Sequence, residues 1–361
     1  MLMVQRGEMI NFSIVGCGRI ARRHADLLGR GQIAGAKLSA VCDIDPAKAA
    51  SYAETYGVPG FERLEDMLAA PGIDAVSILT PSGLHAQHAI MAAQAGKHVV
   101  VEKPMALTVA DADAMIAACE RAGVKLFVVK QNRFNRPIVK ARAALDAGRF
   151  GKLVLGTVRV RWCRRQDYYD QAPWRGTWAQ DGGVLSNQAS HHIDMLEWFM
   201  GEVESVHARA TTALVQIEAE DTAIATLRFR SGALGVIEAT TAARPKDIEG
   251  SLSILGSTGA VEVAGFAMNE IRTWQFADPS PWDEEVIEKF SVNPPNVYGF
   301  GHQAYYEHVV GCLSQGHTAL VDGPEGRRSL ELITAMYESI DTGREIALRP
   351  HPSRARLGVA R

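Results

Sequence analysis

The sequence predicts an α/β protein of two domains: a doubly wound parallel sheet over residues 1–130, then a mostly antiparallel sheet with helices over residues 131–361. Three observations lead to this prediction. The chain has 361 residues, which is long for a single hydrophobic core. Its first part alternates short apolar runs with amphipathic stretches, as strand–helix units do. After about residue 150, strand-like runs follow one another across short turns.

In the first domain, near-continuous apolar runs indicate strands buried on both faces, which is typical of a parallel sheet. The expected strands cover residues 10–16, 36–43, 74–80, 97–103 and 125–130. Helical spacing of apolar residues predicts helices over 18–30, 46–57, 62–70, 83–95 and 108–122. Asp45 before Pro46 caps the second helix, and Thr108 with Asp111 caps the fifth.

In the second domain, apolar and polar residues alternate along several runs, which indicates antiparallel strands with one packed face. The expected strands cover residues 153–162, 203–214, 221–230, 233–242, 250–257 and 259–265. Two helices are expected near the end, over about 302–315 and 325–340. The stretch 277–299 is rich in proline and acidic residues and is expected to cross the surface.

The composition excludes several functional classes. A net charge of −3 argues against a nucleic-acid-binding face. No apolar run reaches the roughly 18–20 residues that span a membrane, and the start lacks a signal peptide, so a cytoplasmic protein is expected. Five cysteines without a CxxC pair argue against a disulfide framework or a zinc cage. No metal site is expected.

Residues 16–21, Gly-Cys-Gly-Arg-Ile-Ala, fit the GxGxxG/A pattern directly after a strand and at the start of a helix. Gly16 allows a tight turn, and Gly18 lets the backbone approach a pyrophosphate at the helix N-terminus. Asp43 ends the second strand, where it can accept hydrogen bonds from the ribose hydroxyls. Because a carboxylate there repels a 2′-phosphate, the sequence predicts a Rossmann domain that binds NAD rather than NADP.

Two further motifs stand at the ends of expected strands: Thr80-Pro81-Ser82 and Glu102-Lys103-Pro104. Together with GCGRIA, TPSGLH and GG-x(7)-HHID, they resemble the Gfo/Idh/MocA family of sugar oxidoreductases over essentially the whole chain. The resemblance implies an NAD-dependent dehydrogenase acting on a sugar CH–OH group, with its active site between the domains and Lys103 beside the nicotinamide. It also implies that the second domain has an open sheet that mediates homo-oligomerisation.

The match over residues 130–200 is similar to the WlbA-type dehydrogenases of bacterial polysaccharide synthesis. It implies oxidation of the 3′-hydroxyl of UDP-N-acetylglucosaminuronic acid, a nucleotide sugar, to the 3-keto sugar. The residues expected to bind the cofactor are Gly16, Gly18, Arg19, Ile20, Asp43, Thr80, Pro81, His85, Glu102, Lys103, Trp174 and Arg175. Those expected to bind the substrate are Lys103, Gln131, Asn132, Arg133, Tyr168, Tyr169, Asn187, Gln188 and His191.

The segment after Gly182-Gly183 is predicted to form one helix that carries two adjacent histidines. Neighbouring helical residues lie about 100° apart around the axis, so His191 and His192 cannot face the same pocket. The family pattern His-x-x-Asp implies that His191 is the active histidine and that Asp194 is structural. His192 is then the variable residue between them.

Asn187 lies one helical turn before His191 and is expected on the same face. Many relatives carry an aspartate at this place. A neutral amide both donates and accepts hydrogen bonds, and it does not repel an acidic sugar. The residue therefore favours an anionic substrate over a polyol.

His191 and Lys103 are the expected catalytic residues. His191 is the expected general base for the hydroxyl proton, and Lys103 the donor that stabilises the developing alkoxide. The two roles can be exchanged on sequence grounds. The alternatives are an inositol or free-sugar dehydrogenase of the same family and a non-catalytic dinucleotide-sensing regulator. The sequence leaves open the reaction direction, the reoxidation of NADH, and the choice between dimer and tetramer.

Overall fold

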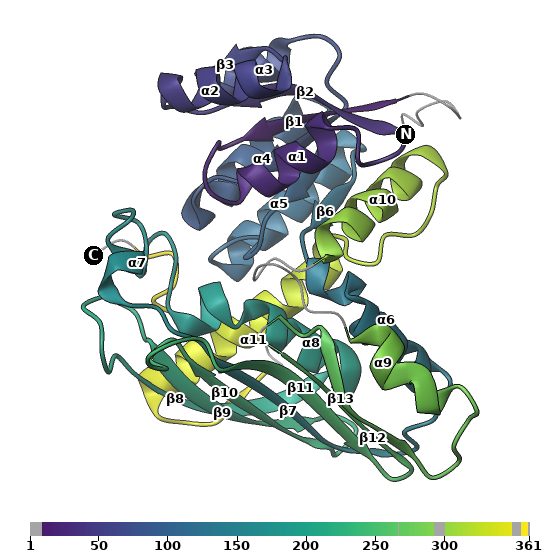
Figure 1. The fold of residues 1–361 in the computed structure, drawn as a ribbon. Helices are drawn as coiled ribbons and strands as arrows, with labels where there is room; N and C mark the ends of the chain where they lie inside the picture. The colour runs from purple at the N-terminus through teal and green to yellow at the C-terminus, as the bar shows by residue number, and fades with distance from the viewer. Residues whose placement is uncertain (1–8, 266, 292–299, 349–354, 360–361) are drawn as a thin grey trace. The chain divides into compact units, whose positions relative to one another are not determined.

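The computed structural model describes residues 9–265, 267–291, 300–348 and 355–359, and Figure 1 traces the chain. Internal contacts divide it into two compact units. Unit 1 comprises Met1–Lys130 and His302–Arg327, and unit 2 comprises Gln131–Gly301 and Arg328–Arg361. Residues 302–327, which the sequence analysis assigned to the second domain, therefore belong to the first unit.

The reason for this correction is visible in the contacts of helix α10 (Gly301–Ser314). The hydroxyl of Tyr306 lies 2.7 Å from Nδ1 of His24 in the first unit. Lys125 Nζ, also of the first unit, donates to the carbonyl oxygen of Cys312 over 2.7 Å. Sequence periodicity predicts that a segment is helical but not which of two cores it joins.

Unit 1 contains a six-stranded parallel sheet in the order β3-β2-β1-β4-β5-β6, which confirms the predicted doubly wound domain. The strands are β1 (Ile10–Val15), β2 (Ala36–Cys42), β3 (Gly60–Phe61), β4 (Ala75–Ile78), β5 (His98–Val101) and β6 (Leu126–Val128). The strand order reverses between β1 and β4, and cofactors bind outside the carboxyl ends of strands at such a switch point.

The helices of residues 1–130 agree with the predicted positions. They are α1 (Ala21–Gly29), α2 (Pro46–Tyr56), α3 (Leu64–Ala69), α4 (His85–Gln94) and α5 (Val109–Ala122), with a 3₁₀ turn η1 (Ser82–Leu84) before α4. The Asp45 side chain accepts hydrogen bonds from the backbone at the start of α2. Thr108 does the same for the backbone N–H of Asp111 at α5. Both predicted caps are confirmed.

Unit 2 contains an eight-stranded sheet in the order β13-β12-β11-β7-β10-β9-β8-β14. Only the pair β7–β10 is parallel, so the predicted mostly antiparallel sheet is confirmed. The strands are β7 (Leu153–Arg161), β8 (Val203–Thr211), β9 (Thr222–Phe229), β10 (Leu234–Thr240), β11 (Glu249–Gly256), β12 (Gly259–Ala264), β13 (Glu270–Phe276) and β14 (Ile346–Ala347). Strands β13 and β14 were not predicted.

The helical elements of the second half were predicted less completely. They are η2 (Gln131–Phe134), α6 (Arg136–Asp146), α7 (Gln166–Tyr169), the π-helix η3 (Val184–Gln188), α8 (Ser190–Met200), η4 (Asp283–Glu285), α9 (Val286–Phe290) and α11 (Gly323–Thr342). Helix α6 was not expected, because alanines occupy much of its buried face. Of the expected surface excursion, residues 277–291 are mostly exposed, and residues 292–299 lie outside the described residues.

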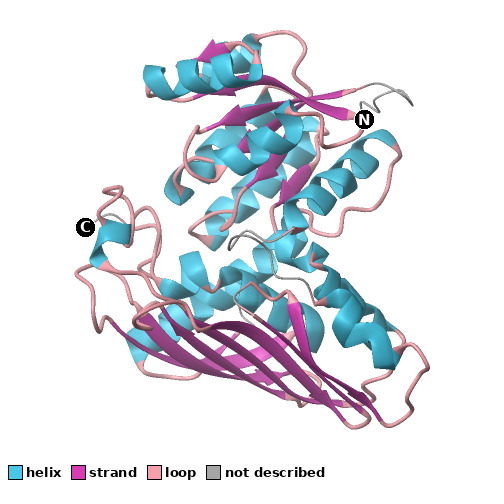
Figure 2. Cartoon of the chain, in the orientation of Figure 1, coloured by secondary structure: helices cyan, strands magenta, loops and turns pink. Residues whose placement is uncertain are grey.

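Helices cover one face of the unit 2 sheet (Figure 2). Gly156 of β7 lies so close to α8 that an added Cβ would stand 2.6 Å from side-chain atoms of Leu196 and Met200. The opposite face exposes apolar side chains of strands β9, β10 and β11, namely Ile224, Leu234, Val236 and Leu255. This exposed apolar surface suits the predicted association, which stays a prediction.

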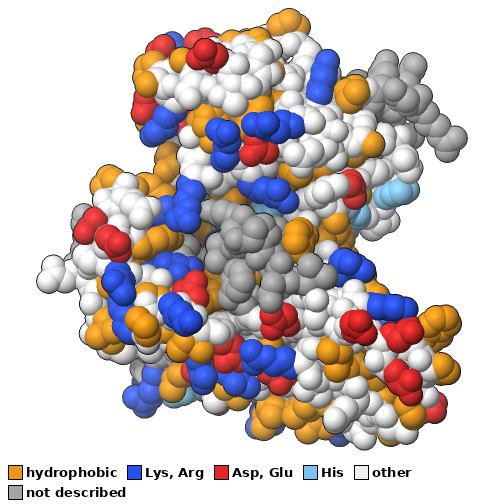
Figure 3. Space-filling model, in the orientation of Figure 1, with side chains coloured by type: hydrophobic (Ala, Val, Ile, Leu, Met, Phe, Trp, Pro, Cys, Tyr) orange, Lys and Arg blue, Asp and Glu red, His pale blue; other side chains and the backbone are white. Residues whose placement is uncertain are grey.

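Three further features of the described residues concern surface charge, helix length and cysteines. On the face of the molecule drawn in Figure 3, Lys and Arg side chains intermingle with Asp and Glu. In the described ranges, no helix combines the length and the apolar character that a membrane span requires. All five cysteines are free thiols, and four of them are buried.

Candidate functional site

The loop between β1 and α1 fits a dinucleotide. Gly16 has a φ of 90°, and an added Cβ would lie 2.8 Å from the carbonyl oxygen of Leu79, so the turn requires glycine. Gly18 is exposed, and nothing lies within 4 Å of where its Cβ would stand. Arg19 is exposed and Ile20 is half-buried beside it. The loop thus leaves open space for phosphate oxygens at the N-terminus of α1.

Asp43 is held in place at the end of β2 by two backbone N–H groups. Its Oδ2 accepts a hydrogen bond from Cys17 over 2.7 Å, and its Oδ1 accepts one from Asp45 over 2.9 Å. Each carboxylate oxygen has a further lone pair that a ribose hydroxyl can use. The fixed negative charge fits a ribose without a 2′-phosphate.

Glu102 and Lys103 follow β5, and the Glu102 carboxylate is buried in a network of histidines. Its Oε1 lies 3.1 Å from Nε2 of His24 and 3.8 Å from Nε2 of His302, while its Oε2 accepts the backbone N–H of Lys103 over 2.9 Å. Burial opposes ionisation, but the hydrogen bonds from both histidines outweigh it and hold the pKa of this carboxyl well below its usual range. An anion therefore lies next to the half-buried Lys103.

The same three side chains are also of the types that bind metal ions. Among the described residues, His24, Glu102 and His302 bring three potential ligand atoms within 4.8 Å of one another. The Glu102 carboxylate already accepts a backbone N–H, and Nδ1 of His24 is 2.7 Å from the hydroxyl of Tyr306. We interpret the group as a hydrogen-bonded network that orients the backbone at Lys103.

His85 connects the two strand-end motifs of unit 1. Its Nε2 lies 2.8 Å from the carbonyl oxygen of Thr80, and its Nδ1 lies 2.8 Å from that of Pro104. A neutral imidazole donates to one of these oxygens and a protonated one to both. His85 is buried, whereas Pro81 and Thr80 are half-buried. The predicted cofactor-binding motifs at β4 and β5 are thus tied together.

In unit 2, the segment before the histidines departs from the predicted continuous helix. Residues Val184–Gln188 form a π-helix, in which the N–H of Ala189 donates to the carbonyl oxygen of Val184 over 2.7 Å. The N–H groups of Val184 and Leu185 donate to the main-chain oxygen and to Oε1 of Glu220, each over 2.9 Å. Glu220 thus satisfies two N–H groups that the start of a helix leaves without an internal partner.

The two histidines of α8 have separate surroundings. Nε2 of the buried His191 lies 3.1 Å from Nε2 of Gln131. An amide NH₂ group only donates, so in this contact the histidine nitrogen is the acceptor and its single lone pair is used by Gln131. His192 is 1% exposed and packs edge-on against Trp162 at 5.5 Å between ring centroids. The role of His191 as a base stays a prediction.

Asp194 anchors α8 through Arg133. The guanidinium donates from Nε to Oδ2 over 2.9 Å and from Nη2 to Oδ1 over 2.8 Å, and both side chains are buried. A paired fork of this kind fixes both groups in geometry. Asn132, on the same η2 turn, is also buried. A substrate contact of Arg133 stays a prediction, and the structure shows a structural contact as well.

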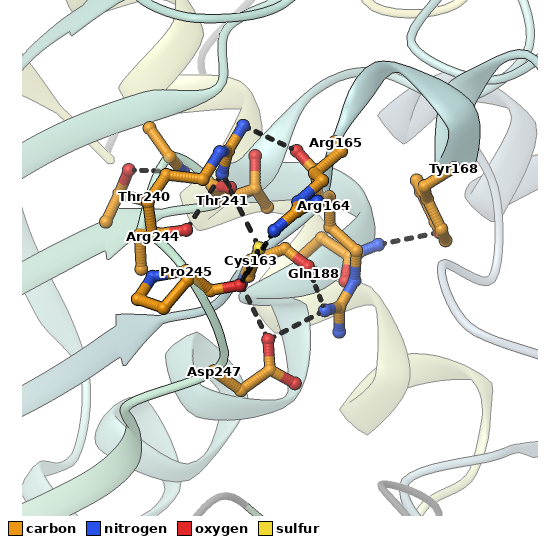
Figure 4. A network of polar contacts seen from close by, with 12 residues as sticks. Cys163, Arg164, Arg165, Tyr168, Gln188, Thr240, Thr241, Arg244, Pro245 and Asp247 are labelled. Atoms are coloured by element: carbon orange, nitrogen blue, oxygen red, sulfur yellow. Dashed lines mark hydrogen bonds and ion pairs between the residues drawn. The ribbon is translucent and has the colours of Figure 1, made fainter.

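The remaining predicted substrate residues meet in one network. The amide nitrogen of Asn187 donates to the Asp181 carboxylate, and Gln188 Nε2 donates to the Tyr168 hydroxyl over 2.9 Å (Figure 4). Arg175 donates to the same hydroxyl over 2.6 Å. Tyr169 is buried, with its hydroxyl 3.1 Å from that of Thr241, and the guanidinium of Arg175 stacks on Trp174 at 4.8 Å.

Three buried polar residues near the predicted cofactor-binding and substrate-binding residues were not predicted from the sequence: His24, Asp181 and Glu220. Asp181 directly precedes the Gly182-Gly183 turn, and His24 interrupts the apolar face of α1, so both stood at informative places. Their partners, however, lie on segments that only the fold brings together. Only the neutral amide of Asn187 entered the prediction from sequence, and the structure adds the carboxylate of Asp181, to which that amide donates.

Two family models match the chain. Residues 10–130 match the Gfo/Idh/MocA oxidoreductase family, NAD-binding Rossmann fold, and residues 142–348 match the C-terminal alpha/beta domain of the same family. Together they cover most of the chain.

Solved structures and named relatives agree with these matches. The chain is 46% identical to the WlbA dehydrogenase from Bordetella pertussis, over 95% of this chain and 99% of that one, with a TM-score of 0.90. It is 44% identical to the WlbA dehydrogenase from Chromobacterium violaceum, over 96% and 99%, with a TM-score of 0.90. Both were crystallised in complex with NADH and UDP-GlcNAcA.

More distant relatives act on other small polyols. D-apiose dehydrogenase from Paraburkholderia graminis is 29% identical over 93% of this chain and 89% of its own length. Myo-inositol 2-dehydrogenase from Thermotoga maritima is 28% identical over 94% of this chain and 98% of its own length. The chain therefore belongs to the Gfo/Idh/MocA oxidoreductase family, and it is an NAD-dependent dehydrogenase of a sugar or polyol.

Proposed function

We propose that the protein oxidises the 3′-hydroxyl of UDP-N-acetylglucosaminuronic acid to the 3-keto sugar. The observation that carries this proposal is the similarity to two enzymes crystallised with NADH and UDP-GlcNAcA, at 46% and 44% identity over nearly the full length of both chains. The apiose and inositol dehydrogenases are 29% and 28% identical.

The residues of this chain account for the proton and for the position of the hydroxyl. NAD, when bound, supplies the acceptor for the hydride that leaves the sugar carbon. His191 takes the hydroxyl proton on Nε2, where the substrate hydroxyl replaces the Gln131 amide as hydrogen-bond partner. Lys103 donates a hydrogen bond to the oxygen as negative charge develops on it. Glu102, Asp43 and the loop at Gly18 hold and orient the groups around the cofactor.

The second candidate is oxidation of a free polyol, which the apiose and inositol relatives favour. A panel of UDP-GlcNAcA, UDP-GlcNAc, myo-inositol and D-apiose, each with NAD, separates the two. Enzyme in stoichiometric amount allows NADH absorbance to be seen whether or not NADH leaves the protein. We expect reduction of NAD with UDP-GlcNAcA. Reduction with myo-inositol or D-apiose but not with UDP-GlcNAcA would contradict the proposal.

A further inference from the structure

A closed ring of hydrogen bonds runs through the predicted substrate residues of unit 2. Asp181 Oδ2 accepts the N–H of Gly176 over 2.8 Å, and its Oδ1 accepts the amide of Asn187. Asn187 Oδ1 accepts from Gln188 Nε2 over 2.7 Å, and the same nitrogen donates to the hydroxyl of Tyr168 over 2.9 Å. Arg175, the residue before Gly176, donates to that hydroxyl over 2.6 Å.

The direction of donation around this ring is set by Asp181. An ionised carboxylate only accepts, so the NH₂ group of Asn187 must face it and the amide oxygen must face away. That oxygen in turn requires the NH₂ group of Gln188. Because one Nε2 carries two hydrogens, Gln188 uses both, one for Asn187 and one for Tyr168. A buried acid that touches no substrate thereby orients two side chains in succession.

The consequence falls on the Tyr168 hydroxyl. A hydroxyl oxygen has two lone pairs and one hydrogen, and nitrogen donors from Arg175 and Gln188 occupy both lone pairs. In the described part of the chain, this hydroxyl makes only these two hydrogen bonds. Its own hydrogen is therefore committed to donation toward a ligand. Tyr168 is half-buried, so a ligand can reach it.

The charges beside Tyr168 define the ligand. The guanidinium of Arg175 stacks 4.5 Å from the Tyr168 ring centroid and forms no salt bridge with any described residue. The guanidinium of Arg164 lies 5.6 Å from the same centroid and is paired with Asp247 over 2.9 Å (Figure 4). The Arg175 guanidinium, which has no carboxylate partner among the described residues, lies next to the Tyr168 hydroxyl, whose hydrogen is available to a ligand. This pair favours binding of an anionic oxygen.

We propose that Tyr168 and Arg175 bind an anionic oxygen of the substrate, and that Asp181 is the positioning residue that keeps the Tyr168 hydroxyl a donor. This inference rests on the proposed function, whose substrate carries such oxygens on the uronate carboxylate and on the diphosphate. Binding of UDP-GlcNAcA, UDP-GlcNAc and UDP to the enzyme–NADH complex distinguishes the two sources.

In the first arm, Tyr168→Phe removes the donor and keeps the ring. We expect the Kd of UDP-GlcNAcA to rise about 10- to 100-fold, the effect of one hydrogen bond to a charged group. A rise confined to UDP-GlcNAcA assigns the donor to the carboxylate, and a rise with all three ligands assigns it to the diphosphate. Unchanged Kd values for all three overturn the proposal.

The second arm tests the relay. In Asp181→Asn the new amide can donate, so the ring is free to reverse, and the same Kd should rise. The double variant with Tyr168→Phe should then bind no more weakly than Tyr168→Phe alone. Additive losses would show that Asp181 acts elsewhere. Asp170→Asn, an exposed carboxylate of the same segment, is the matched control and should leave every Kd unchanged.

A third variant keeps the test decisive if Asp181→Asn does not fold. Gln188→Glu places an acceptor next to Tyr168, so the tyrosine hydrogen turns inward and the ligand loses its donor. We expect the ligand pattern of Tyr168→Phe, and wild-type Kd values would contradict the relay. Wild-type turnover of UDP-GlcNAcA is read separately. If the wild type binds and oxidises UDP-GlcNAcA but the variants bind all ligands as the wild type does, only the inference fails. If the wild type neither binds nor oxidises it, the proposed function fails as well.

Discussion

At the scale of single residues, the doubled histidine of α8 resolves into two different surroundings. His191 faces the amide of Gln131 with a nitrogen that accepts, whereas His192 is packed against Trp162. The neighbouring Asn187 does not stand alone, because its amide is bound to Asp181. The chemistry of this helix therefore depends on what each side chain contacts and not on which residue types are adjacent.

Substitution of the two proposed catalytic groups tests their roles. His191→Asn removes the base and Lys103→Met removes the donor, and each should lower kcat with UDP-GlcNAcA by about 10²- to 10⁴-fold. Steady-state kinetics measure the effect. His192→Asn is the matched control, since it should lower the melting temperature and change kcat little. Equal kcat values for the two asparagine variants would refute the assignment to His191.

The two glycines of the β1–α1 loop should respond differently to the same methyl group. Gly16→Ala combines a φ of 90° with a contact of 2.8 Å to Leu79, so we expect it to lower the free energy of unfolding by about 1–3 kcal/mol. Gly18→Ala meets no protein atom, so stability should stay within about 0.5 kcal/mol while the Kd of NADH rises about tenfold. Urea unfolding and NADH titration measure both. Equal stability losses would contradict this account of the loop.

At the scale of elements, the π-helix η3 depends on the buried Glu220. Its carboxylate accepts from the N–H of Leu185 and from the hydroxyl of Tyr337, each over 2.9 Å. Burial raises the pKa of Glu220 to about 7, and these hydrogen bonds only partly offset it. The element that carries Asn187 therefore begins on an acid that is half ionised near neutral pH.

Glu220→Gln should change the pH dependence of stability. The pKa is raised on folding, from 4.5 to about 7, so the contribution of the acid is fully present below pH 4.5 and is lost as the pH rises through 7. Between these pH values we expect the free energy of unfolding of the wild type to fall by up to about 3 kcal/mol from this group, and that of the variant not to fall. Denaturant unfolding at several pH values measures it. Glu62→Gln, at an exposed position, should follow the wild-type curve, and a parallel curve for Glu220→Gln would argue against the burial effect.

How far the sequence predicts these elements depends on the distance between partners along the chain. The doubly wound sheet of unit 1, the caps at Asp45 and Thr108, and the loop at Gly16 follow from local patterns, and these were predicted, whereas the order of the strands was not. The π-helix was not predicted, and Glu220, which accepts the N–H of Leu185 at its start, lies 35 positions away along the chain. Asp181 was missed for a related reason: a carboxylate in a loop carries no periodic signal until its partner is known.

At the scale of the whole molecule, the exposed face of the unit 2 sheet predicts association. Val236 is 37% exposed and Ile224 56% exposed on adjacent strands. Val236→Glu places a charge within this apolar surface and should convert an oligomer to monomers in light-scattering measurements. Val139→Glu, on an exposed position of α6, should leave the oligomer intact. A monomeric wild type would contradict the prediction.

Under the proposed function, hydride leaves the carbon that bears the 3′-hydroxyl of UDP-N-acetylglucosaminuronic acid. A single turnover with substrate deuterated at that carbon, using stoichiometric enzyme and NAD, tests this step. We expect mass spectrometry of the extracted cofactor to find the deuterium in the reduced nicotinamide. Reduced cofactor without deuterium, or no reduction while myo-inositol is oxidised, would contradict it.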